Sequence, residues 1–237
     1  MKIEVWSDIM CPFCYIGKRN YEAALDQFAD KAHVELEWKS FQLDPSIDPM
    51  PTQKNVYTYL AERKGMSYEQ VVAMHEQVKA TARKAGLEYD FDRAVVSNSF
   101  NAHRIIQMAK LKGLGDQAEE RFFAAYFTRG ENLSDGTVLT TIGKDIGLSE
   151  EEVRQALNDG KYAQLVQNDI AEAQEIGVTG VPFFVVNRKY AISGAQPIEV
   201  FVQTIEQAYR EWQAARPSLI VEHGASGPSC TPDGHCD

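Results

Sequence analysis

Apolar and polar positions alternate in two short segments near the N-terminus and recur at helical spacing between them. Residues 2–6 (KIEVW) and 34–43 (VELEWKSFQL) have the pattern typical of strands. Between them, one face of a predicted helix collects Cys14, Gly17, Tyr21, Leu25 and Phe28. The first forty or so residues therefore predict a β-α-β unit.

The middle of the chain has a different pattern. From about residue 52 to residue 176, Leu, Val, Met, Phe and Ile recur every three or four positions, and no good alternating run occurs. Glycines divide this stretch into helices of ordinary length; they are Gly65, Gly86, Gly113, Gly130, Gly147 and Gly160. We therefore predict a helical insertion over residues 49–176.

The strand pattern returns after the helical stretch. FFVVN (183–187) and YAIS (190–193) predict a hairpin whose turn holds residues 187–189. A last helix is predicted to open at Pro197, because proline suits the first helical position. Its apolar stripe contains Ile198, Phe201, Val202, Ile205, Tyr209 and Trp212. Residues 216–237 are rich in Gly, Ser and Pro and predict a flexible tail.

The net charge and the length of the chain exclude several classes of protein. The 24 Lys and Arg face 34 Asp and Glu, which gives a net charge of -10 without any basic block. This excludes a nucleic-acid surface and a polybasic membrane anchor. The N-terminus runs directly into a strand without a signal-peptide pattern, and no stretch has transmembrane length, so we expect a cytoplasmic protein. A chain of 237 residues buries enough surface to fold without disulfides.

The sequence CPFC at residues 11–14 is the strongest chemical signal. In the cytoplasm such a C-x-x-C points to redox or metal chemistry. A helix that begins at about Cys11 places that sulfur among free backbone N–H groups at the positive end of the helix dipole, which favours the thiolate. Pro12 suits the first turn, and Lys18 and Arg19 are candidates for adding positive potential. Cys11 is therefore the predicted nucleophile.

Cys14 lies three residues further on, on the face predicted to turn toward the core. Burial there disfavours a charged sulfur, so Cys14 is the predicted resolving thiol. A substrate disulfide attacked by Cys11 would give a mixed disulfide that Cys14 resolves, and the reverse reaction would oxidise a substrate dithiol. The direction of electron flow depends on the reduction potential, which the sequence does not give.

Two other interpretations of the cysteines stay open. Cys11 and Cys14 could be buried inert thiols, or they could bind zinc together with Cys230 and Cys236. Five residues separate Cys230 from Cys236, and this spacing lacks the tight knuckle typical of zinc ligands. As a redox pair, Cys230 and Cys236 would be an auxiliary dithiol that relays electrons; the alternative is a tail pair without a role.

Other polar and aromatic residues give weaker signals. His103 and Arg104 share a predicted helix, where capping or interdomain hydrogen bonding is favoured over catalysis. No constellation surrounds three other histidines, which are His33, His75 and His223. Aromatic residues in the insertion are predicted to belong to the hydrophobic core, which is a more common role for them than contact with a substrate. They are Phe122, Phe123, Tyr126 and Phe127.

The order of elements and the two motifs together resemble a known family. A C-x-x-C after the first strand and a Val-Pro before the strand at 183 resemble the thioredoxin fold, here with a helical insertion, as in DsbA-family thiol-disulfide oxidoreductases. Five segments are similar to the FrnE subgroup: SDIMCPFCYIGKRN, SNSFNAHRIIQMAK, AYFTRGENLSD, GVTGVPFFVVN and ISGAQP. The chain departs from that pattern at Phe13, where tryptophan is common. The resemblance implies an α/β protein with a thioredoxin-like domain at 1–48 and 177–215.

The resemblance also implies a function. It makes the protein a thiol-disulfide oxidoreductase or isomerase acting on protein or small-thiol disulfides, without cofactor or metal. Glutathione or a thioredoxin system would exchange electrons with it, and the oligomeric state stays open. The residues implied at the substrate site are Pro12, Phe13, Val181 and Pro182. The Val181–Pro182 bond is implied to be cis, which would place the Val181 backbone beside Cys11 for an extended substrate to pair with; from the sequence alone, a trans proline starting an edge strand is favoured.

Two further function classes remain as alternatives. The kappa-class glutathione transferases and hydroxychromene-carboxylate isomerases share the fold, activate glutathione with a Ser-type position and need no second cysteine. The presence of Cys14 therefore favours the oxidoreductase. A zinc-binding module without enzymatic activity is the third class, and bound metal in stoichiometric amount would reveal it.

Overall fold

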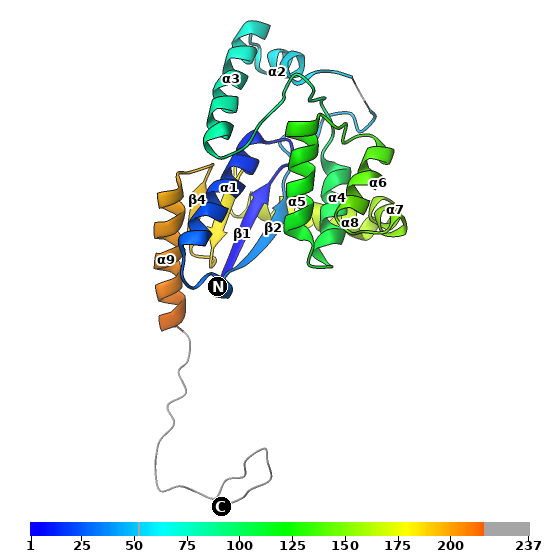
Figure 1. Cartoon of the computed structure of the whole chain (residues 1–237). Helices are drawn as coiled ribbons and strands as arrows, with labels where there is room; N and C mark the ends of the chain where they lie inside the picture. The colour runs from blue at the N-terminus through cyan, green and yellow to red at the C-terminus, as the bar shows by residue number, and fades with distance from the viewer. Residues whose placement is uncertain (52, 216–237) are drawn as a thin grey trace, which may run out of the picture.

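A four-stranded mixed sheet joins the two ends of the chain in this computed structural model, which describes residues 1–51 and 53–215 (Figure 1). The strands are β1 (Lys2–Ser7), β2 (Glu35–Ser40), β3 (Phe183–Val186) and β4 (Tyr190–Ser193), in the order β2-β1-β3-β4. β1 is parallel to β2 and antiparallel to β3, which pairs antiparallel with β4. Val5 lies opposite both Trp38 and Phe184. The predicted α/β class is confirmed.

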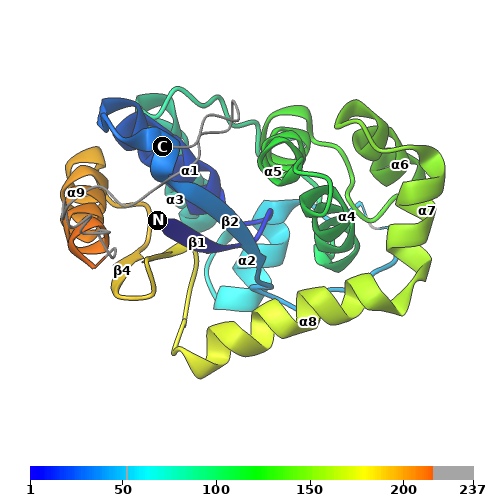
Figure 2. The same cartoon turned by 90° about the horizontal axis from the view of Figure 1, so that it is seen from below.

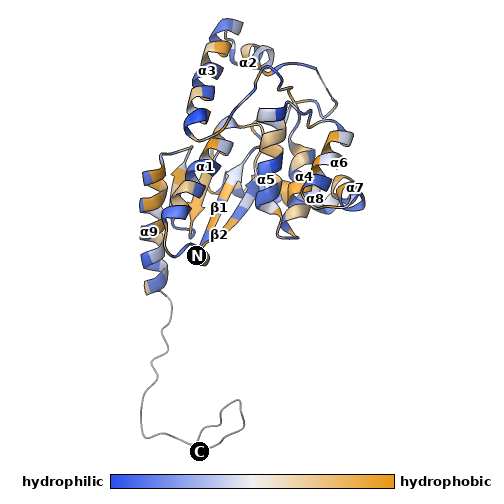
Figure 3. Cartoon of the chain, viewed as in Figure 1, coloured by the Kyte–Doolittle hydropathy of each residue, from blue (hydrophilic) through white to orange (hydrophobic). Residues whose placement is uncertain are grey.

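Two helices from opposite ends of the chain cover one face of the sheet. They are α1 (Pro12–Gln27) and α9 (Ile198–Ala214), which pack against each other beside β4 and β3 (Figure 1). Apolar strand residues such as Ile3 and Val5 meet the stripes of both helices, and the strands are among the most hydrophobic segments of the molecule (Figure 3). The apolar face of the strands, which repeats every two residues, and those of the helices, which repeat every 3.6 residues, therefore pack into one core.

The helical insertion lies between β2 and β3, and its last helix covers the other face of the sheet. Its elements are α2 (Val56–Lys64), α3 (Tyr68–Lys84), α4 (Phe100–Lys110), α5 (Gly115–Ala124), the π-helical turn η2 (Ala125–Arg129), α6 (Gly136–Asp145), α7 (Glu150–Asn158) and α8 (Gly160–Glu175). α8 runs alongside the sheet, and α4, α6 and α7 lie on the side remote from α9 (Figure 2). Trp6 of β1 faces Ala173 of α8 and donates its indole N–H to the Asp169 carbonyl at 2.8 Å. The insertion is thus fixed to the sheet.

Helices α2 and α3 form a hairpin beyond the end of the sheet at which α1 begins (Figure 1). Ser67 caps α3 in a capping box with Gln70, and Gly65 ends α2 with φ 63°. The hairpin returns to the centre of the molecule, where α3 contacts α1.

Local boundaries differ from the sequence predictions in several places. Pro197 is the N-cap of α9 and not its first helical residue. Residues 85–99 form an irregular segment, although the middle of the chain was predicted to be helical throughout. Gly160 begins α8 and does not end a helix, because Asp159 is both the C-cap of α7 and the N-cap of α8. The hairpin turn at 187–189 is confirmed, with Asn187 and Arg188 at φ 52° and 54°. Within the described part of the chain, no helix is long and apolar enough to cross a membrane.

Candidate active site

The first cysteine of CPFC occupies the N-cap of α1. Pro12 is the first helical residue, where its missing N–H costs no hydrogen bond. The Cys11 N–H donates to the Asp8 carbonyl at 2.8 Å, and the Cys14 N–H donates to the Cys11 carbonyl at 3.0 Å. Both cysteines are free thiols. The predicted start of the helix is confirmed. The free N–H groups and the positive end of the helix dipole of α1 therefore lie at Cys11.

Cys14 lies behind Cys11 in the core. Its side chain is 1 % exposed. Burial raises its pKa well above the usual value, and the neighbouring Cys11 raises it further. The Asp8 backbone and the Ser7 hydroxyl face the Cys14 sulfur and oppose part of this rise. At neutral pH Cys14 is therefore a protonated thiol that must lose a proton before it can act as a nucleophile.

The loop before β3 contacts the Cys11 sulfur. Cys11 Sγ lies 3.3 Å from the Val181 carbonyl oxygen, and the Val181–Pro182 bond is cis, as the resemblance implied. Gly17 of α1 allows this approach, because a Cβ at that position would lie 2.9 Å from Pro182 Cγ. Two segments separated by 170 residues thus meet at one sulfur.

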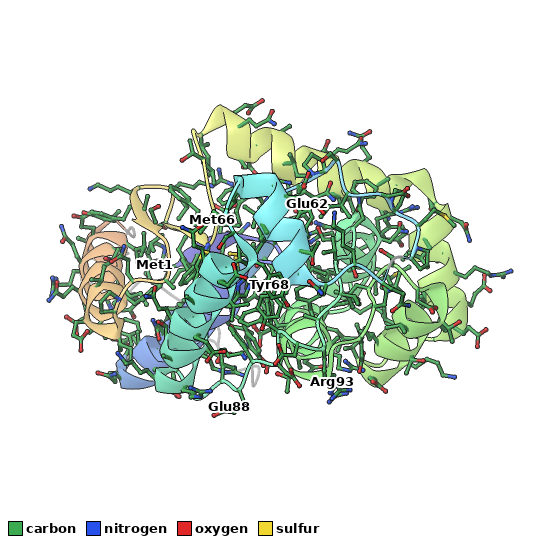
Figure 4. The ribbon with its side chains drawn as sticks, turned by 90° about the horizontal axis from the view of Figure 1, so that it is seen from above. Met1, Glu62, Met66, Tyr68, Glu88 and Arg93 are labelled. Atoms are coloured by element: carbon green, nitrogen blue, oxygen red, sulfur yellow. The ribbon has the colours of Figure 1, made fainter. Side chains whose placement is uncertain are left out.

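A cavity of about 590 Å³ opens in front of Cys11. The α2–α3 hairpin supplies mainly apolar lining residues, including Tyr59, Leu60, Met74 and Val78. Phe13, which is 42 % exposed, lines the cavity on the side of the cysteine motif. Figure 4 shows α2 and α3 from above, with Met66 and Tyr68 at their junction. An apolar cavity of this size beside a thiol suits a drug-sized molecule or a side chain of a larger substrate.

The irregular segment 85–99 and the π-helical turn η2 complete the cavity. Tyr89 donates its hydroxyl to the Pro12 carbonyl at 2.7 Å, which ties the segment to the cysteine motif. The Asp90 N–H donates to the Phe127 carbonyl at 2.7 Å, and Tyr126 and Phe127 of η2 line the cavity. A π-helical turn shifts the register of side chains, and such turns are frequent at functional sites.

The two cations predicted near Cys11 are compensated by carboxylates. Lys18 is 2 % exposed and forms ion pairs with Glu22, Asp116 and Glu120. Arg19 pairs with Glu22 and Glu120, and Tyr15 donates to Glu120 at 2.5 Å. Their positive charge therefore serves the contact between α1 and α5 more than the potential at the sulfur.

The structure brings six of the predicted site residues together around one sulfur. They are Cys11, Cys14, Pro12, Phe13, Val181 and Pro182. Cys230 and Cys236 lie outside the described residues. Arg104 donates to the Asp159 carbonyl at 3.2 Å, which agrees with a structural role. Among residues 1–51 and 53–215, no group of three or more His, Cys, Asp or Glu is arranged to hold a metal ion.

Sequence reasoning missed several residues of the site. Tyr89 lies in a segment predicted to be helical, and His75 lines the cavity although it has no neighbours in sequence that suggest a site. Burial lowers the pKa of His75, and its Nδ1 lies 2.8 Å from the Val71 carbonyl, so the ring is neutral with Nδ1 as the donor. The sequence does not indicate that Asp8 in SDIMC is buried, since a short acidic residue before a helix usually indicates a cap.

Comparisons with known proteins agree with this fold. The family model of the DSBA-like thioredoxin domain matches residues 2–206. The chain is similar to the crystal structure of a probable DsbA oxidoreductase, SCO1869, from Streptomyces coelicolor, with 37% identity, a TM-score of 0.83 and coverage of 100% of this chain and 98% of that one. It is 27% identical to the uncharacterized protein YwbO of Bacillus subtilis, over 88% of this chain and 98% of that protein. The cytosolic disulfide reductase DsbM from Pseudomonas aeruginosa shares the fold at 16% identity, with a TM-score of 0.62 over 89% of this chain and 100% of that one.

Proposed function

The chain belongs to the family of DSBA-like thioredoxin domains, and on that premise we propose that it is a thiol-disulfide oxidoreductase whose redox pair is Cys11 and Cys14. One observation carries this proposal: a cysteine at the N-terminus of α1 lines an apolar cavity, while a second cysteine lies buried behind it. Cys11 is 5 % exposed where it lines the cavity and Cys14 is 1 % exposed, so a substrate in the cavity would meet the Cys11 sulfur first.

The reaction follows from these two positions. The Cys11 thiolate attacks one sulfur of a substrate disulfide, the substrate S–S bond breaks, and the other substrate sulfur leaves as a thiolate. Cys14 then loses its proton and attacks the Cys11 sulfur of the mixed disulfide. The second substrate thiolate leaves, a Cys11–Cys14 disulfide forms, and two electrons have passed to the substrate. Run in reverse, the same steps oxidise a substrate dithiol.

The surroundings of the sulfur suit substrates that carry an apolar group next to the disulfide. Phe13 and the α2–α3 hairpin would contact that group, and the backbone at Val181 would align an extended segment beside Cys11. Substrates would be protein or small-thiol disulfides, with glutathione or a thioredoxin system as the electron partner. A cytoplasmic location fits this chemistry and the cytosolic relative of the same fold.

Single-cysteine variants of the full chain test this function. Cys11→Ser should abolish reduction of a protein disulfide by dithiothreitol-fed enzyme, while Cys14→Ser should accumulate mixed disulfides that mass spectrometry locates at Cys11. A variant with Cys230→Ser and Cys236→Ser is the control and should keep the exchange at Cys11–Cys14. Full turnover by Cys14→Ser would contradict the proposal and favour a glutathione-dependent transferase or isomerase with one reactive thiol.

A further inference from the structure

Four charged side chains line the cavity in front of Cys11, within the part of the chain that the structure describes. Asp8 and Asp44 come from the segments that follow β1 and β2, and Arg63 and Lys64 are the last two residues of α2. A charge on a mainly apolar wall acts on a bound molecule more strongly than a charge in open water. Each of the four therefore bears on which disulfide the cavity binds.

Asp44 and Arg63 neutralise each other. The Arg63 guanidinium forms an ion pair with the Asp44 carboxylate and donates a hydrogen bond to the Leu43 carbonyl at 3.2 Å. The Tyr59 hydroxyl also donates to Asp44. This pair therefore offers a substrate little net charge.

The Asp8 charge is balanced from inside the protein. Its carboxylate accepts the N–H groups of Met10 at 3.2 Å and Leu43 at 2.8 Å. The same carboxylate lies 3.6 Å from Nε2 of the buried His103. Because Asp8 is only 1 % exposed, a molecule in the cavity meets little of its charge.

Lys64 is the exception among the four. Its side chain is exposed at the end of α2, and no carboxylate in the described part of the chain lies within ion-pair distance of its ammonium group. Two carboxylates of the α2–α3 hairpin have other partners, since Glu62 pairs with Lys54 and Glu76 pairs with Lys79 at 2.8 Å. Lys64 thus brings an unpaired positive charge to the cavity.

The charge of Lys64 reaches the cavity wall. Burial lowers the pKa of His75, which lines the cavity from α3, and the positive charges of Lys79 and Lys64 lower it further. Because Lys79 is already paired with Glu76, Lys64 is the cation left for a bound anion. A lysine at the end of a helix also stabilises that helix, a role that Lys64 shares with Lys84 at the end of α3.

Resting on the proposed function, we propose that Lys64 makes the cavity selective for disulfides that carry a carboxylate beside an apolar group. The apolar group lies against Phe13 and the α2–α3 hairpin, and the carboxylate faces the Lys64 ammonium group while Cys11 attacks the neighbouring sulfur. A bond forms between Cys11 and that sulfur, the substrate S–S bond breaks, and the other half leaves as a thiolate. Lys64 takes no part in these bond changes. An exposed ion pair of this kind favours the acidic substrate by about three- to fivefold in rate.

Two aromatic disulfides that differ in charge test this selectivity. Reduced full-length protein carrying Cys230→Ser and Cys236→Ser is mixed with 5,5′-dithiobis(2-nitrobenzoate), which has a carboxylate on each ring, or with 4,4′-dithiodipyridine, which is neutral at neutral pH. The second-order rate constant of the first thiol release reports attack by Cys11. Lys64→Gln should lower the ratio of the anionic to the neutral rate constant by about three- to fivefold, and Lys64→Arg should keep it. High salt should lower the ratio in the parent protein.

Lys84→Gln is the matched control. Lys84 is exposed and ends α3, as Lys64 is exposed and ends α2, but it does not line the cavity. The control removes the same charge from the same hairpin and should leave the ratio within about 1.5-fold. An unchanged ratio in Lys64→Gln, or an equal fall in both variants, would overturn the proposal. If Cys11→Ser releases thiol from both disulfides as fast as the parent does, the proposed function is wrong instead.

Two peptide disulfides show which kind of molecule supplies the carboxylate. The symmetric disulfides of acetyl-Glu-Phe-Cys-amide and acetyl-Gln-Phe-Cys-amide differ only in charge, and formation of the Cys11–Cys14 disulfide is followed by acid quenching and mass spectrometry. A preference for the acidic peptide that Lys64→Gln removes supports acidic segments of protein substrates. A preference seen only with the aromatic disulfides supports small acidic molecules. No preference for the anionic member of either pair would overturn the proposal.

Discussion

Replacing Gly17 by alanine tests whether the close packing of α1 on the Pro182 loop determines the geometry at Cys11. An alanine Cβ would lie 2.9 Å from Pro182 Cγ and 3.5 Å from a ring carbon of Phe184. Ordinary contact begins at about 3.4 Å, so Pro182 must move by about 0.5 Å. The same loop places the Val181 carbonyl 3.3 Å from Cys11 Sγ, and it would move with Pro182.

Two opposing contributions set the stability of Gly17→Ala. Alanine is favoured over glycine inside a helix by about 0.5–1 kcal/mol, whereas overpacking a filled core costs about 1–3 kcal/mol. We expect a net loss of about 1 kcal/mol in the free energy of unfolding, measured with urea under reducing conditions. The control is Gly136→Ala in the first turn of α6, where nothing lies within 4 Å of the new Cβ and a gain of about 0.5 kcal/mol is expected.

The displacement of the Pro182 loop in Gly17→Ala should also slow disulfide reduction. A shift of about 1 Å at a reacting group costs up to about a hundredfold in rate, so a shift of half that size should lower kcat/KM for disulfide reduction by about tenfold. Gly136→Ala should leave it unchanged. If Gly17→Ala stabilises the protein as the control does and keeps full kcat/KM, the Pro182 loop relocates freely and the reasoning is refuted.

Two further predictions concern groups near the cavity and in the core. Tyr89→Phe removes the hydroxyl that donates to the Pro12 carbonyl and should lower the free energy of unfolding by about 1 kcal/mol. Tyr68→Phe, which changes an exposed tyrosine on α3, is the neutral control. Equal urea midpoints for the two variants would contradict this prediction. Because the pKa of Glu119 is raised in the folded state from 4.5 to about 7, its contribution to stability is present at low pH and declines as pH rises through this interval. The free energy of unfolding of the wild type relative to Glu119→Gln should therefore fall by about 3 kcal/mol between about pH 4.5 and 7.5. Urea titrations measure this difference, and a difference that does not change with pH would contradict a buried, neutral Glu119.

The sequence predicted the elements whose signals are local. Alternation located the strands, and the N-cap position of Cys11 followed from a proline placed just inside a helix. The turn at Asn187 and Arg188 lies between two β-rich runs, which is the usual hairpin signal. The position of Cys14 on the buried face followed from its spacing along α1.

Residues whose environment depends on distant contacts could not be predicted. Segment 85–99 contains apolar residues at helical spacing, but its backbone bonds to η2 through Asp90 and its Tyr89 bonds to the cysteine motif. No local pattern encodes either contact. His103 and Glu119 resemble ordinary helix residues. Only the packing of α4 against α5 and α8 shows that they are buried, and that both ring nitrogens of His103 and Oε2 of Glu119 lack a hydrogen-bond partner.

The most direct test of the central claim is an equilibrium redox titration of the full chain in glutathione buffers, with thiols trapped at low pH and located by mass spectrometry. We predict one two-electron transition confined to Cys11 and Cys14. A midpoint near about -120 to -200 mV would indicate an oxidant or isomerase, and one near about -270 mV a reductase. If both cysteines stay thiols in the most oxidising buffers, or form disulfides only with other cysteines, they are not the redox pair and the proposed function is wrong.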